Sequence, residues 1–412
     1  MELTLGTTRL SGELRIPPSK SVAHRALICA ALSAGEHRIA HLERNDDVIA
    51  TARALETLGA RVEWTDDGAT VIGIERCRPI EDAVIDCNES GSTLRFIVPI
   101  VLAMGARNVR LIGRGKLGSR PMRAYRDLCA AQGIGYRDAS ADHADRRLDL
   151  TLDGKLRADT FRMPGDVSSQ FLTGLLFAMP LLDGCTRLEW TTPLESTGYL
   201  DLTLQAMREA GIRIDCDASG YACAPQTYRM GACEIEGDYS QAAFFAVANA
   251  LGGDVRVQGL RADSLQGDRA IYPMLERLAR SDGQTLRLDG ADCPDIIPVL
   301  CVACALRNGT TVLERVGRLR LKECDRQQAI VRELSALGAD IRAQGDTIEI
   351  RGVPRLRGGV EVDSHADHRI AMSLAIAACA CESPIRLRGA ECVSKSYPNF
   401  FEDYRRLGGT AK

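Results

Sequence analysis

The sequence predicts an α+β protein of two lobes, each built from three similar units. Three observations lead to this prediction. Apolar helices led by Ser, Thr or Asp recur about every 70 residues. An amphipathic helix and short alternating strands follow each of them in most copies. The chain of 412 residues is also long enough for two large domains. Each unit thus has the order strand–helix–strand–helix–strand–strand, and the chain holds six units.

The first helix of each unit is apolar on nearly every side, as in segment 171–182. A helix of this kind should be buried all round. The six predicted copies are Ser21–Gly35, Ser92–Gly105, Ser168–Gly184, Ser240–Gly253, Asp295–Gly309 and Asp367–Glu382. Because three such helices could pack about a shared axis, two lobes of three units fit better than a solenoid, which is the alternative.

The second helix of each unit is amphipathic and should lie outside the first. The clearest copies, with the strands that follow, are Ala52–Ile74, Leu202–Cys223 and Ala329–Ile350; weaker copies begin near Ala124 and Ala270, and a truncated one is Phe400–Gly408. The fourth unit is short, since only 55 residues separate the Ser240 and Asp295 helix starts. Its closing hairpin is reduced to Gln284–Asp289.

Composition and charge exclude several classes of protein. Hydrophobic residues make up 45% and charged residues 26%, which is ordinary for a globular protein. A net charge of −3 and 5% aromatic residues argue against a nucleic-acid partner. No apolar run reaches the 18 or so residues that span a bilayer. The segment Met1–Gly6 does not resemble a signal peptide, so we expect a cytoplasmic protein without a membrane partner.

The cysteines and histidines do not predict a metal site. The 15 cysteines are scattered, and most suit a reduced protein that uses Cys as a small apolar residue. The one C-x-x-C pair, Cys301 and Cys304, lies in an apolar, helix-like run. His365 and His368 have no third ligand at metalloenzyme spacing. We therefore expect no metal.

One glycine-rich segment matches a nucleotide-binding pattern only superficially. Gly113–Gly118 has the form G-x-G-x-x-G after a strand-like segment. However, Pro121 interrupts the chain where the helix of that motif should already have begun. We therefore expect no dinucleotide.

Polar and basic residues gather where the apolar helices begin. A helix N-terminus presents unpaired N–H groups and a partial positive charge, which suits an anion. Serine and aspartate caps alone would be structural. Lys20, Arg25, Arg95 and Arg369 stand in the same starts, however, where a buried charge would be costly without a partner. Several such ends facing one cleft would bind a small phosphate or carboxylate ester.

Two further segments are rich in charge. Lys322–Arg326 opens the fifth amphipathic helix, and in isolation this cluster indicates a solvated face with an exposed ion pair. Arg114–Arg126 holds five basic residues and forms either a basic loop that faces the cleft or ordinary surface.

Ten motifs in order along nearly the whole chain resemble those of the 5-enolpyruvylshikimate-3-phosphate synthase family. Any one of them would be weak, but ten in the right order are specific. The motifs are Pro18–Arg25, Ser90–Arg95, Ser119–Met122, Gly165–Thr173, Glu195–Tyr199, Glu236–Ser240, Pro294–Asp295, Leu321–Arg326, Asp367–Met372 and Lys395–Pro398.

The resemblance implies a fold and a reaction. The fold would be an α-β prism (an inside-out barrel) with two lobes of three βαβαββ units and the active site in the cleft between them. The lobes would be residues 20–236, and residues 1–19 with 237–412. The enzyme would transfer the enolpyruvyl group of phosphoenolpyruvate to the 5-hydroxyl of shikimate 3-phosphate, in the shikimate pathway of aromatic amino acid biosynthesis. It would work as a cytoplasmic monomer without a cofactor.

The resemblance also implies the site residues. Asp295 is similar to the base of the family, and Glu323 and Lys20 to the groups that transfer a proton at the methylene carbon. The residues expected to bind phosphoenolpyruvate are Lys20, Gly91, Arg120, Gln170, Arg326, Arg369 and Lys395. Those expected to bind shikimate 3-phosphate are Lys20, Ser21, Arg25, Ser168, Ser169, Gln170, Ser196, Asp295 and Lys322. Tyr199 and Arg95 would support them. Arginine suits these roles because its guanidinium binds carboxylates and phosphates with two hydrogen bonds.

Three positions depart from the family pattern. Glu89 stands where many members have Asn, and a carboxylate pointing inward would weaken anion binding. Arg318 replaces an Asn that contacts the shikimate phosphate in some members. Phe96 replaces a Pro, so the second helix start is expected to sit differently.

Three alternatives accompany this interpretation. A UDP-N-acetylglucosamine enolpyruvyl transferase would carry a reactive Cys in a loop of its first lobe, but Arg114–Arg120 contains none and Cys129 falls on the next helix. An RNA 3′-phosphate cyclase shares only the fold. A non-catalytic, anion-binding relative lacks support, because every expected acid, base and clamp residue is present.

Overall fold

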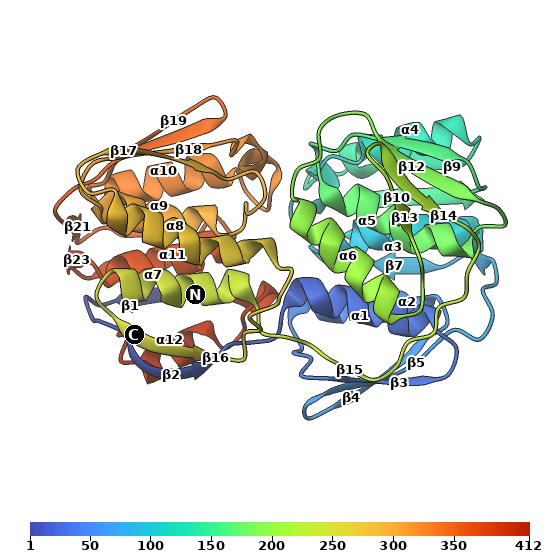
Figure 1. Cartoon of the computed structure of the whole chain (residues 1–412), viewed down its shortest axis with the longest axis horizontal. Coiled ribbons are helices and arrows are strands. Elements are labelled where there is room, and N and C mark those ends of the chain that lie inside the picture. Colours follow the sequence, from blue (N-terminus) through green and yellow to red (C-terminus); the bar gives the residue numbers. More distant parts are fainter. The chain divides into compact units, whose positions relative to one another are not determined.

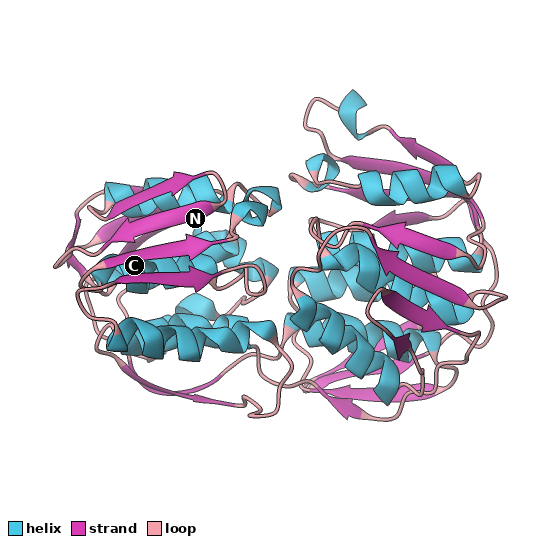
Figure 2. Cartoon of the chain, turned by 45° about the horizontal axis from the view of Figure 1, so that its top comes forward, coloured by secondary structure: helices cyan, strands magenta, loops and turns pink.

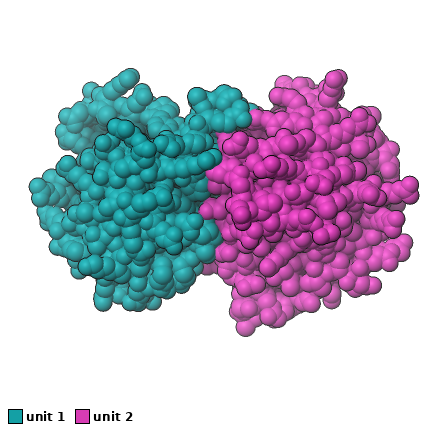
Figure 3. Space-filling view, turned by 90° about the horizontal axis from the view of Figure 1, so that it is seen from below, with its two compact units in different colours: residues 1–17, 237–412 teal, residues 18–236 magenta.

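The computed structural model describes all 412 residues, and the chain forms two compact units. Unit 1 comprises residues 1–17 and 237–412, and unit 2 comprises residues 18–236 (Figure 3). The first crossing between them follows Pro17, two residues before the expected boundary. No helix is both long and apolar enough to span a membrane.

Three apolar helices form the core of unit 2. They are α1 (Lys20–Leu32), α3 (Gly91–Met104) and α5 (Ser169–Ala178), and nearly all their side chains are buried. The amphipathic helices α2 (Asp46–Thr57), α4 (Arg123–Ala131) and α6 (Thr197–Glu209), labelled in Figure 1, bury only part of their side chains and expose the rest. The prediction that the first helix of each unit is buried and the second lies outside it is confirmed here.

Unit 1 repeats this arrangement. Its core helices α7 (Tyr239–Ala250), α9 (Ile297–Leu306) and α11 (His368–Ala378) pack against one another. The outer helices are α8 (Ile271–Arg280), α10 (Arg326–Ala336) and α12 (Phe400–Arg406), the last being the truncated copy. The apolar periodicity of the sequence therefore predicted the helices of both units.

Three open sheets line unit 2, one for each repeat, with the helices on their inner side (Figure 2). In each, one strand of a hairpin pairs antiparallel with a further strand, which also has a parallel neighbour. The strands of the first sheet are β15 (Cys233–Glu234), β3 (Glu36–Ala40), β5 (Gly68–Ile72) and β4 (Arg61–Thr65). The second holds β6 (Ile80–Glu81), β7 (Val84–Asp86), β8 (Ala106–Gly113), β10 (Leu148–Gly154) and β9 (Gly135–Asp138). The third holds β11 (Thr160–Met163), β12 (Thr186–Trp190), β14 (Gly220–Cys223) and β13 (Asp215–Cys216).

Unit 1 has one four-stranded sheet and three smaller ones, and residues 1–17 supply a strand to two of the smaller sheets. β1 (Glu2–Leu5) pairs antiparallel with β24 (Ile385–Arg388), and β2 (Ser11–Arg15) pairs parallel with β16 (Asp254–Gln258). The other strands are β17 (Thr285–Asp289), β18 (Thr310–Glu314), β19 (Asp340–Gln344), β20 (Thr347–Arg351), β21 (Leu356–Gly358), β22 (Glu361–Asp363) and β23 (Cys381–Ser383). The reduced fourth unit is confirmed, because its hairpin is the single strand β17, which pairs parallel with β18.

Two helices begin later than predicted, and both differences place charged residues in loops. α9 begins at Ile297 rather than Asp295, because Pro298 fits only in the first turn of a helix. α10 begins at Arg326 rather than Lys322, because the carboxylate of Asp325 caps it by accepting from Gln328 N at 3.0 Å. Asp295, Lys322 and Glu323 therefore precede their helices.

Candidate active site

Each unit carries its own group of predicted site residues. Unit 2 holds Lys20, Ser21, Arg25, Gly91, Arg120, Ser168, Ser169, Gln170 and Ser196, whereas unit 1 holds Asp295, Lys322, Glu323, Arg326, Arg369 and Lys395. No group of three or more His, Cys, Asp or Glu side chains is placed to hold a metal ion.

Arg326 is the centre of the polar network in unit 1. Its side chain is only 2% exposed, and each guanidinium nitrogen donates to a different carboxylate. Nε lies 2.7 Å from Asp367 Oδ2, Nη1 2.9 Å from Asp295 Oδ1, and Nη2 2.8 Å from Glu323 Oε2. Burial alone would lower the pKa of Arg326, but these carboxylates raise it well above its usual value. The prediction that the Lys322–Arg326 segment forms a solvated face is wrong, because the guanidinium of Arg326 is buried. Its three carboxylate partners offset the cost of burying that charge.

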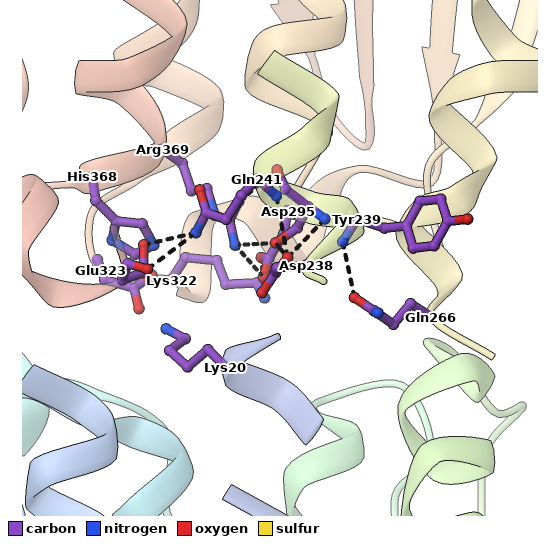
Figure 4. A network of polar contacts seen from close by, with 12 residues as sticks. Lys20, Asp238, Tyr239, Gln241, Gln266, Asp295, Lys322, Glu323, His368 and Arg369 are labelled. Atoms are coloured by element: carbon purple, nitrogen blue, oxygen red, sulfur yellow. Dashed lines mark hydrogen bonds and ion pairs between the residues drawn. The ribbon is translucent and has the colours of Figure 1, made fainter. Parts of the chain in front are cut away.

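Three cations surround the carboxylate of Asp295, and Figure 4 labels two of them, Lys322 and Arg369. Besides Arg326, Lys322 Nζ lies 3.1 Å from Oδ1 and Arg369 Nη2 lies 3.7 Å from Oδ2. Burial would raise the pKa of Asp295, but Lys322, Arg369 and Arg326 outweigh it and hold the pKa well below its usual value. Asp295 is therefore an ionised hydrogen-bond acceptor at neutral pH.

Asp367 fixes the two arginines relative to each other. Its Oδ2 accepts from Arg326, and its Oδ1 caps α11 by accepting from Arg369 N at 2.8 Å. The guanidinium of Arg369 then donates to Ser240, from Nη1 to the carbonyl at 3.0 Å and from Nη2 to Oγ at 2.7 Å. One buried aspartate thus positions two cations on neighbouring helices.

Lys395 is buried at the end of a short 3₁₀ helix, Ala390–Lys395. The hydroxyl of the next residue, Ser396, accepts from Gln241 Nε2 at 3.1 Å. Gln241 lies on α7, the helix that also carries the Ser240 partner of Arg369. This bond ties the Lys395 segment to the helix beside the network.

A second buried carboxyl belongs to the same surroundings. Asp268 lies on a 3₁₀ turn, Gly267–Ala270, and is 5% exposed. Burial and the charge of Asp295 raise its pKa to about 7, with Asp238 adding to the shift while Arg369 and Lys322 oppose it. Asp268 and Asp295 therefore differ in protonation over much of the acidic range.

In unit 2, Lys20 begins α1 and is paired with a residue that the sequence did not indicate. Its Nζ donates to Asp47 Oδ2 at 2.8 Å, and both side chains are largely buried. Asp47 lies in the first turn of α2, where an acidic residue is favoured by the helix dipole. An acidic residue at that place carries no functional signal in a single sequence.

Arg25 is buried and held by three acceptors. Its Nε donates to Thr203 Oγ1 at 2.9 Å, Nη1 to the carbonyl of Ser21 at 2.6 Å, and Nη2 to the carbonyl of Tyr199 at 2.7 Å. Burial lowers its pKa to about 10, so it stays charged at neutral pH. Phe96, one of the departures from the family pattern, lies with its ring centroid 5.5 Å from this guanidinium, a cation–π contact.

A chain of side chains connects the starts of α3 and α5. Arg95 Nη1 donates to Gln170 Oε1 at 2.7 Å, and Gln170 Nε2 donates to Ser92 Oγ at 2.9 Å. Ser168 caps α5 by accepting from Gln170 N at 3.3 Å, and Ser169 beside it is buried. The structure therefore brings Gln170, Ser168 and the supporting Arg95 together.

Gly91 is the first residue of α3, and its lack of a side chain matters. A Cβ there would collide with the guanidinium of Arg120 and would come within 3.0 Å of Arg95 Nη1. Glycine therefore lets Arg120 lie over the start of the helix, where a positive side chain and free N–H groups together favour an anion.

Ser196 precedes α6 with an unusual backbone. Its φ is +57°, which lies in the left-handed region that residues with a side chain rarely adopt, and it is buried. Strain of this kind is common at functional sites.

Glu89 and Arg318, the two charged residues that depart from the family pattern, each have an identifiable neighbour in the structure. Glu89 lies beside Gly115 in the basic loop, because a Cβ on that glycine would collide with the carboxylate. Arg318 Nη2 donates to the carbonyl of Ala291 at 2.7 Å and so braces the loop that leads to Asp295. Of the basic residues in 114–126, Arg120 is half-buried, whereas Arg114, Lys116, Arg123 and Arg126 are exposed.

Sequence reasoning missed three residues of these networks. Asp367 was recognised only as part of a motif, although its place at a helix start between two basic segments was a usable signal. Asp47 and Asp268 are single acidic residues whose role depends on side chains far away in the sequence. The pairing of such residues appears only in the folded chain.

The fold of this chain is that of solved enolpyruvyl transferases. The fold matches a solved EPSP synthase from Acinetobacter baumannii with a TM-score of 0.79 and 23% identity, covering 100% of this chain and 99% of that one. It also matches the enolpyruvyl transferase NikO from Streptomyces tendae with a TM-score of 0.75 and 17% identity, covering 100% and 98%. Likeness at this level of identity establishes the fold.

The chain belongs to the EPSP synthase (3-phosphoshikimate 1-carboxyvinyltransferase) family, whose model matches residues 5–404. It is 46% identical to the 3-phosphoshikimate 1-carboxyvinyltransferase of Clostridioides difficile, covering 99% of this chain and 97% of that protein. It is 47% identical to the enzyme of the same name from Clostridium botulinum strain Alaska E43, covering 97% and 96%. The family resemblance seen in the sequence is confirmed.

Proposed function

We propose that this chain is a 3-phosphoshikimate 1-carboxyvinyltransferase of the shikimate pathway of aromatic amino acid biosynthesis. It transfers the carboxyvinyl group of phosphoenolpyruvate to the 5-hydroxyl of shikimate 3-phosphate and releases phosphate. The observation that carries the proposal is the ionised carboxylate of Asp295 with Lys322, Arg326 and Arg369 around it. Such a cluster pairs a proton acceptor with charges that hold a polyanion. The names of the relatives, at 41–47% identity, agree with this function.

In the first step, the oxygen of the 5-hydroxyl attacks C2 of phosphoenolpyruvate, and the carboxylate of Asp295 accepts the proton of that hydroxyl. The methylene carbon of the donor takes up a proton, which gives a tetrahedral adduct. In the second step, the C2–O bond to phosphate breaks and the new methyl group returns a proton. The net reaction forms one C–O bond, breaks another, and leaves inorganic phosphate.

The cations explain how Asp295 can act as a base although its pKa is low. Lys322, Arg369 and Arg326 hold that pKa down in the free protein. A bound phosphate or carboxylate offsets these charges, and this raises the basicity of Asp295 when the substrates are in place. The proton acceptor is therefore activated by the molecule that it acts upon.

We assign the transfer of the proton at the methylene carbon to Glu323 and Lys20. Glu323 is 12% exposed at the side chain and is held by Arg326 at 2.8 Å. Lys20 is held by Asp47 at 2.8 Å. Both side chains have fixed positions, and each can exchange a proton.

The residues of both units serve one pair of substrates in this proposal. Phosphoenolpyruvate is held by Lys20, Gly91, Arg120, Gln170, Arg326, Arg369 and Lys395. Shikimate 3-phosphate is held by Lys20, Ser21, Arg25, Ser168, Ser169, Gln170, Ser196, Asp295 and Lys322. The burial and fixed hydrogen bonds of Arg25, Arg326 and Arg369 support these assignments, because preorganised cations bind an anion with little loss of side-chain freedom.

The proposal also describes the molecule as a cytoplasmic monomer with an α-β prism in each lobe. All 15 cysteines carry free thiols, which fits a reducing compartment. Sedimentation of the purified protein tests the monomer.

Phosphate release by the pure protein tests the function, with phosphoenolpyruvate as donor and two acceptors in parallel. We expect release with shikimate 3-phosphate and none with UDP-N-acetylglucosamine. Release with UDP-N-acetylglucosamine alone would assign the chain to the other enolpyruvyl transferase reaction. Release with neither would contradict a catalytic role, and Glu89 and Arg318 would then be the first residues to restore to the family pattern.

A further inference from the structure

The four residues before α11 have a strained backbone. Residues 364–367 connect β22 to this helix and end at Asp367, which holds both arginines of the network. His365 has a φ of +53° and Ala366 a φ of +55°, so two consecutive residues with side chains lie in the left-handed region. Residues other than glycine persist there only where their surroundings hold them.

Glu333 of α10 holds this segment at two points. Its Oε1 accepts from His365 Nε2 at 2.8 Å, and its Oε2 accepts from Asp363 N at 3.1 Å. The carboxylate is 5% exposed, and an ionised carboxylate only accepts, so His365 Nε2 carries the hydrogen. Further bonds stabilise the turn, from His365 N to Asp363 Oδ1 at 2.6 Å and from Ser364 Oγ to the carbonyl of Gly389 at 2.9 Å.

The same helix, α10, also binds the far end of the segment. Arg326 and Glu333 are seven residues apart, or about two helical turns, and therefore share one face of α10. Arg326 Nε binds Asp367, while Glu333 binds His365. Because α10 packs against α11, this double attachment fixes the start of α11 relative to the start of α10.

The start of α11 carries Arg369, whose guanidinium donates to Ser240 and lies near Asp295 (Figure 4). A shift of the segment would therefore change the spacing between Arg326 and Arg369. The proposed function assigns both arginines to phosphoenolpyruvate, which carries its phosphate and its carboxylate on the same carbon, so their separation is confined to a narrow range.

We propose that His365 and Glu333 are positioning residues, whose hydrogen bond holds the strained segment so that Arg326 and Arg369 keep the spacing that one phosphoenolpyruvate molecule requires. This inference rests on the proposed function. It assigns His365 a role in donor affinity rather than in metal binding, and it explains why a backbone strain is maintained directly before the cation cluster.

Substitutions at His365 separate positioning from local stability. His365→Ala removes the bond to Glu333, and we expect it to raise KM for phosphoenolpyruvate roughly tenfold while KM for shikimate 3-phosphate stays within about twofold. His365→Gln keeps an N–H donor at a similar reach, so KM should return to within about threefold of the parent value. His365→Gly relieves the backbone strain but not the loss of the bond, so its KM should match that of the alanine variant.

Two other variants complete the test. Glu333→Gln weakens the same interaction, and combined with His365→Ala it should add little further loss, because both changes break one bond. Arg332→Ala is the control: Arg332 is 76% exposed and lies 3.6 Å from Glu333 Oε1, and its removal should leave both KM values unchanged. The inference is overturned if His365→Ala leaves the donor KM unchanged, raises both KM values alike, or is rescued by glycine rather than by glutamine.

Hydrogen exchange keeps this inference separate from the proposed function. An inactive parent protein would contradict the function, but the amides of residues 366–369 would still report on the segment. We expect faster exchange there in His365→Ala and parent rates in Arg332→Ala. Equal rates in all three proteins would refute the positioning role whether or not the protein is active.

Discussion

Two aspartates in the same surroundings, Asp268 buried and Asp295 partly buried, have opposite pKa shifts. Three cations hold the pKa of Asp295 well below its usual value in spite of burial, whereas burial and the charge of Asp295 raise the pKa of Asp268 to about 7. Paired carboxyls whose pKa values are pushed apart are typical of sites that move protons. Here the ionised member, Asp295, is the one with direct cation contacts.

Replacement of Asp295 should abolish most of the chemistry. Asp295→Asn keeps the size of the side chain but cannot accept the hydroxyl proton, so we expect kcat to fall by about 10²- to 10⁴-fold, with KM changed only a few-fold. Steady-state kinetics measure this. Asp292→Asn, at an exposed aspartate in the same turn, is the matched control and should leave kcat unchanged. A kcat for Asp295→Asn within a few-fold of the parent would show that another group is the base.

Asp268 should make the stability of the protein depend on pH. Because its folded pKa of about 7 exceeds the usual value of 3.8, the folded state holds a proton that the unfolded chain has lost between these pH values. The contribution of Asp268 to the free energy of unfolding is therefore complete below about pH 4 and declines as the pH rises to 7. Asp268→Asn cannot ionise, so its advantage over the parent should grow from near zero at pH 4 to about 4 kcal/mol at pH 8. Urea unfolding at both pH values measures it, and a constant difference would rule out the shift.

At the scale of single residues, the sequence motifs indicated the charged residues of the unit 1 cluster but not the residues around it, Asp268, His365 and Glu333. Arg326, Arg369 and Asp295 carry charges at helix starts, which is a visible pattern. The raised pKa of Asp268 arises from its burial near Asp295, and the positioning role of His365 arises from its bond to Glu333 of α10. Contacts of this kind depend on tertiary structure and leave no periodic signal in the sequence.

The starts of the apolar helices are the elements that present the site. Gly91 begins α3 with the Arg120 and Arg95 side chains close to it, and Asp367 caps α11, which has Arg369 in its first turn. Each start combines unpaired backbone N–H groups with a side-chain cation. In the proposed site both contributions would act on the same anion, so the position of the helix would matter as much as the charge.

Gly91→Ala should weaken donor binding without unfolding the protein. The added Cβ meets only the ends of the flexible Arg120 and Arg95 side chains, so the melting temperature should stay within about 2 °C. Displacement of Arg120 should raise KM for phosphoenolpyruvate roughly tenfold, measured by steady-state kinetics. Gly231→Ala, where a Cβ meets nothing within 4 Å, is the control. An unchanged donor KM in Gly91→Ala would remove Arg120 from the proposed clamp.

The existence of the helices could be predicted because their apolar pattern is strong. The residues at which they begin could be predicted less accurately. The start of α9 moves from Asp295 to Ile297 because of Pro298, and that of α10 from Lys322 to Arg326 because Asp325 is the cap. Both differences come from local backbone chemistry that competes with charge patterning. They place Asp295, Lys322 and Glu323 in loops, where ion pairs with one another and with Arg326 hold their side chains.

For the molecule as a whole, the first residues of the chain complete the sheets of the unit formed by its last residues. β1 pairs with β24 from Glu2–Arg388 to Leu5–Ile385, and β2 pairs with β16. The internal repeats predicted the count of six units. The family resemblance predicted that the N-terminal segment belongs to the same lobe as the C-terminal residues. Strand pairing over such distances cannot be derived from one sequence, because it depends on tertiary contacts.

Removal of residues 2–5 should destabilise unit 1 selectively. Leu3 and Leu5 are buried, so their loss should cost roughly 3–6 kcal/mol, and β24 would become an open edge. Hydrogen exchange should show faster exchange in β24 and parent rates in β10 of unit 2. Equal acceleration in both strands would mean that the two units unfold as one body.

The central claim is that this chain moves a carboxyvinyl group and not a phosphoryl group. Phosphoenolpyruvate labelled with ¹⁸O in the bridging position tests it directly, with shikimate 3-phosphate as acceptor. Because the proposed reaction breaks the C–O bond, mass spectrometry should find the label in the released phosphate, and the acceptor should gain the mass of the carboxyvinyl group. Label that stays with pyruvate would show P–O cleavage and contradict the proposed function.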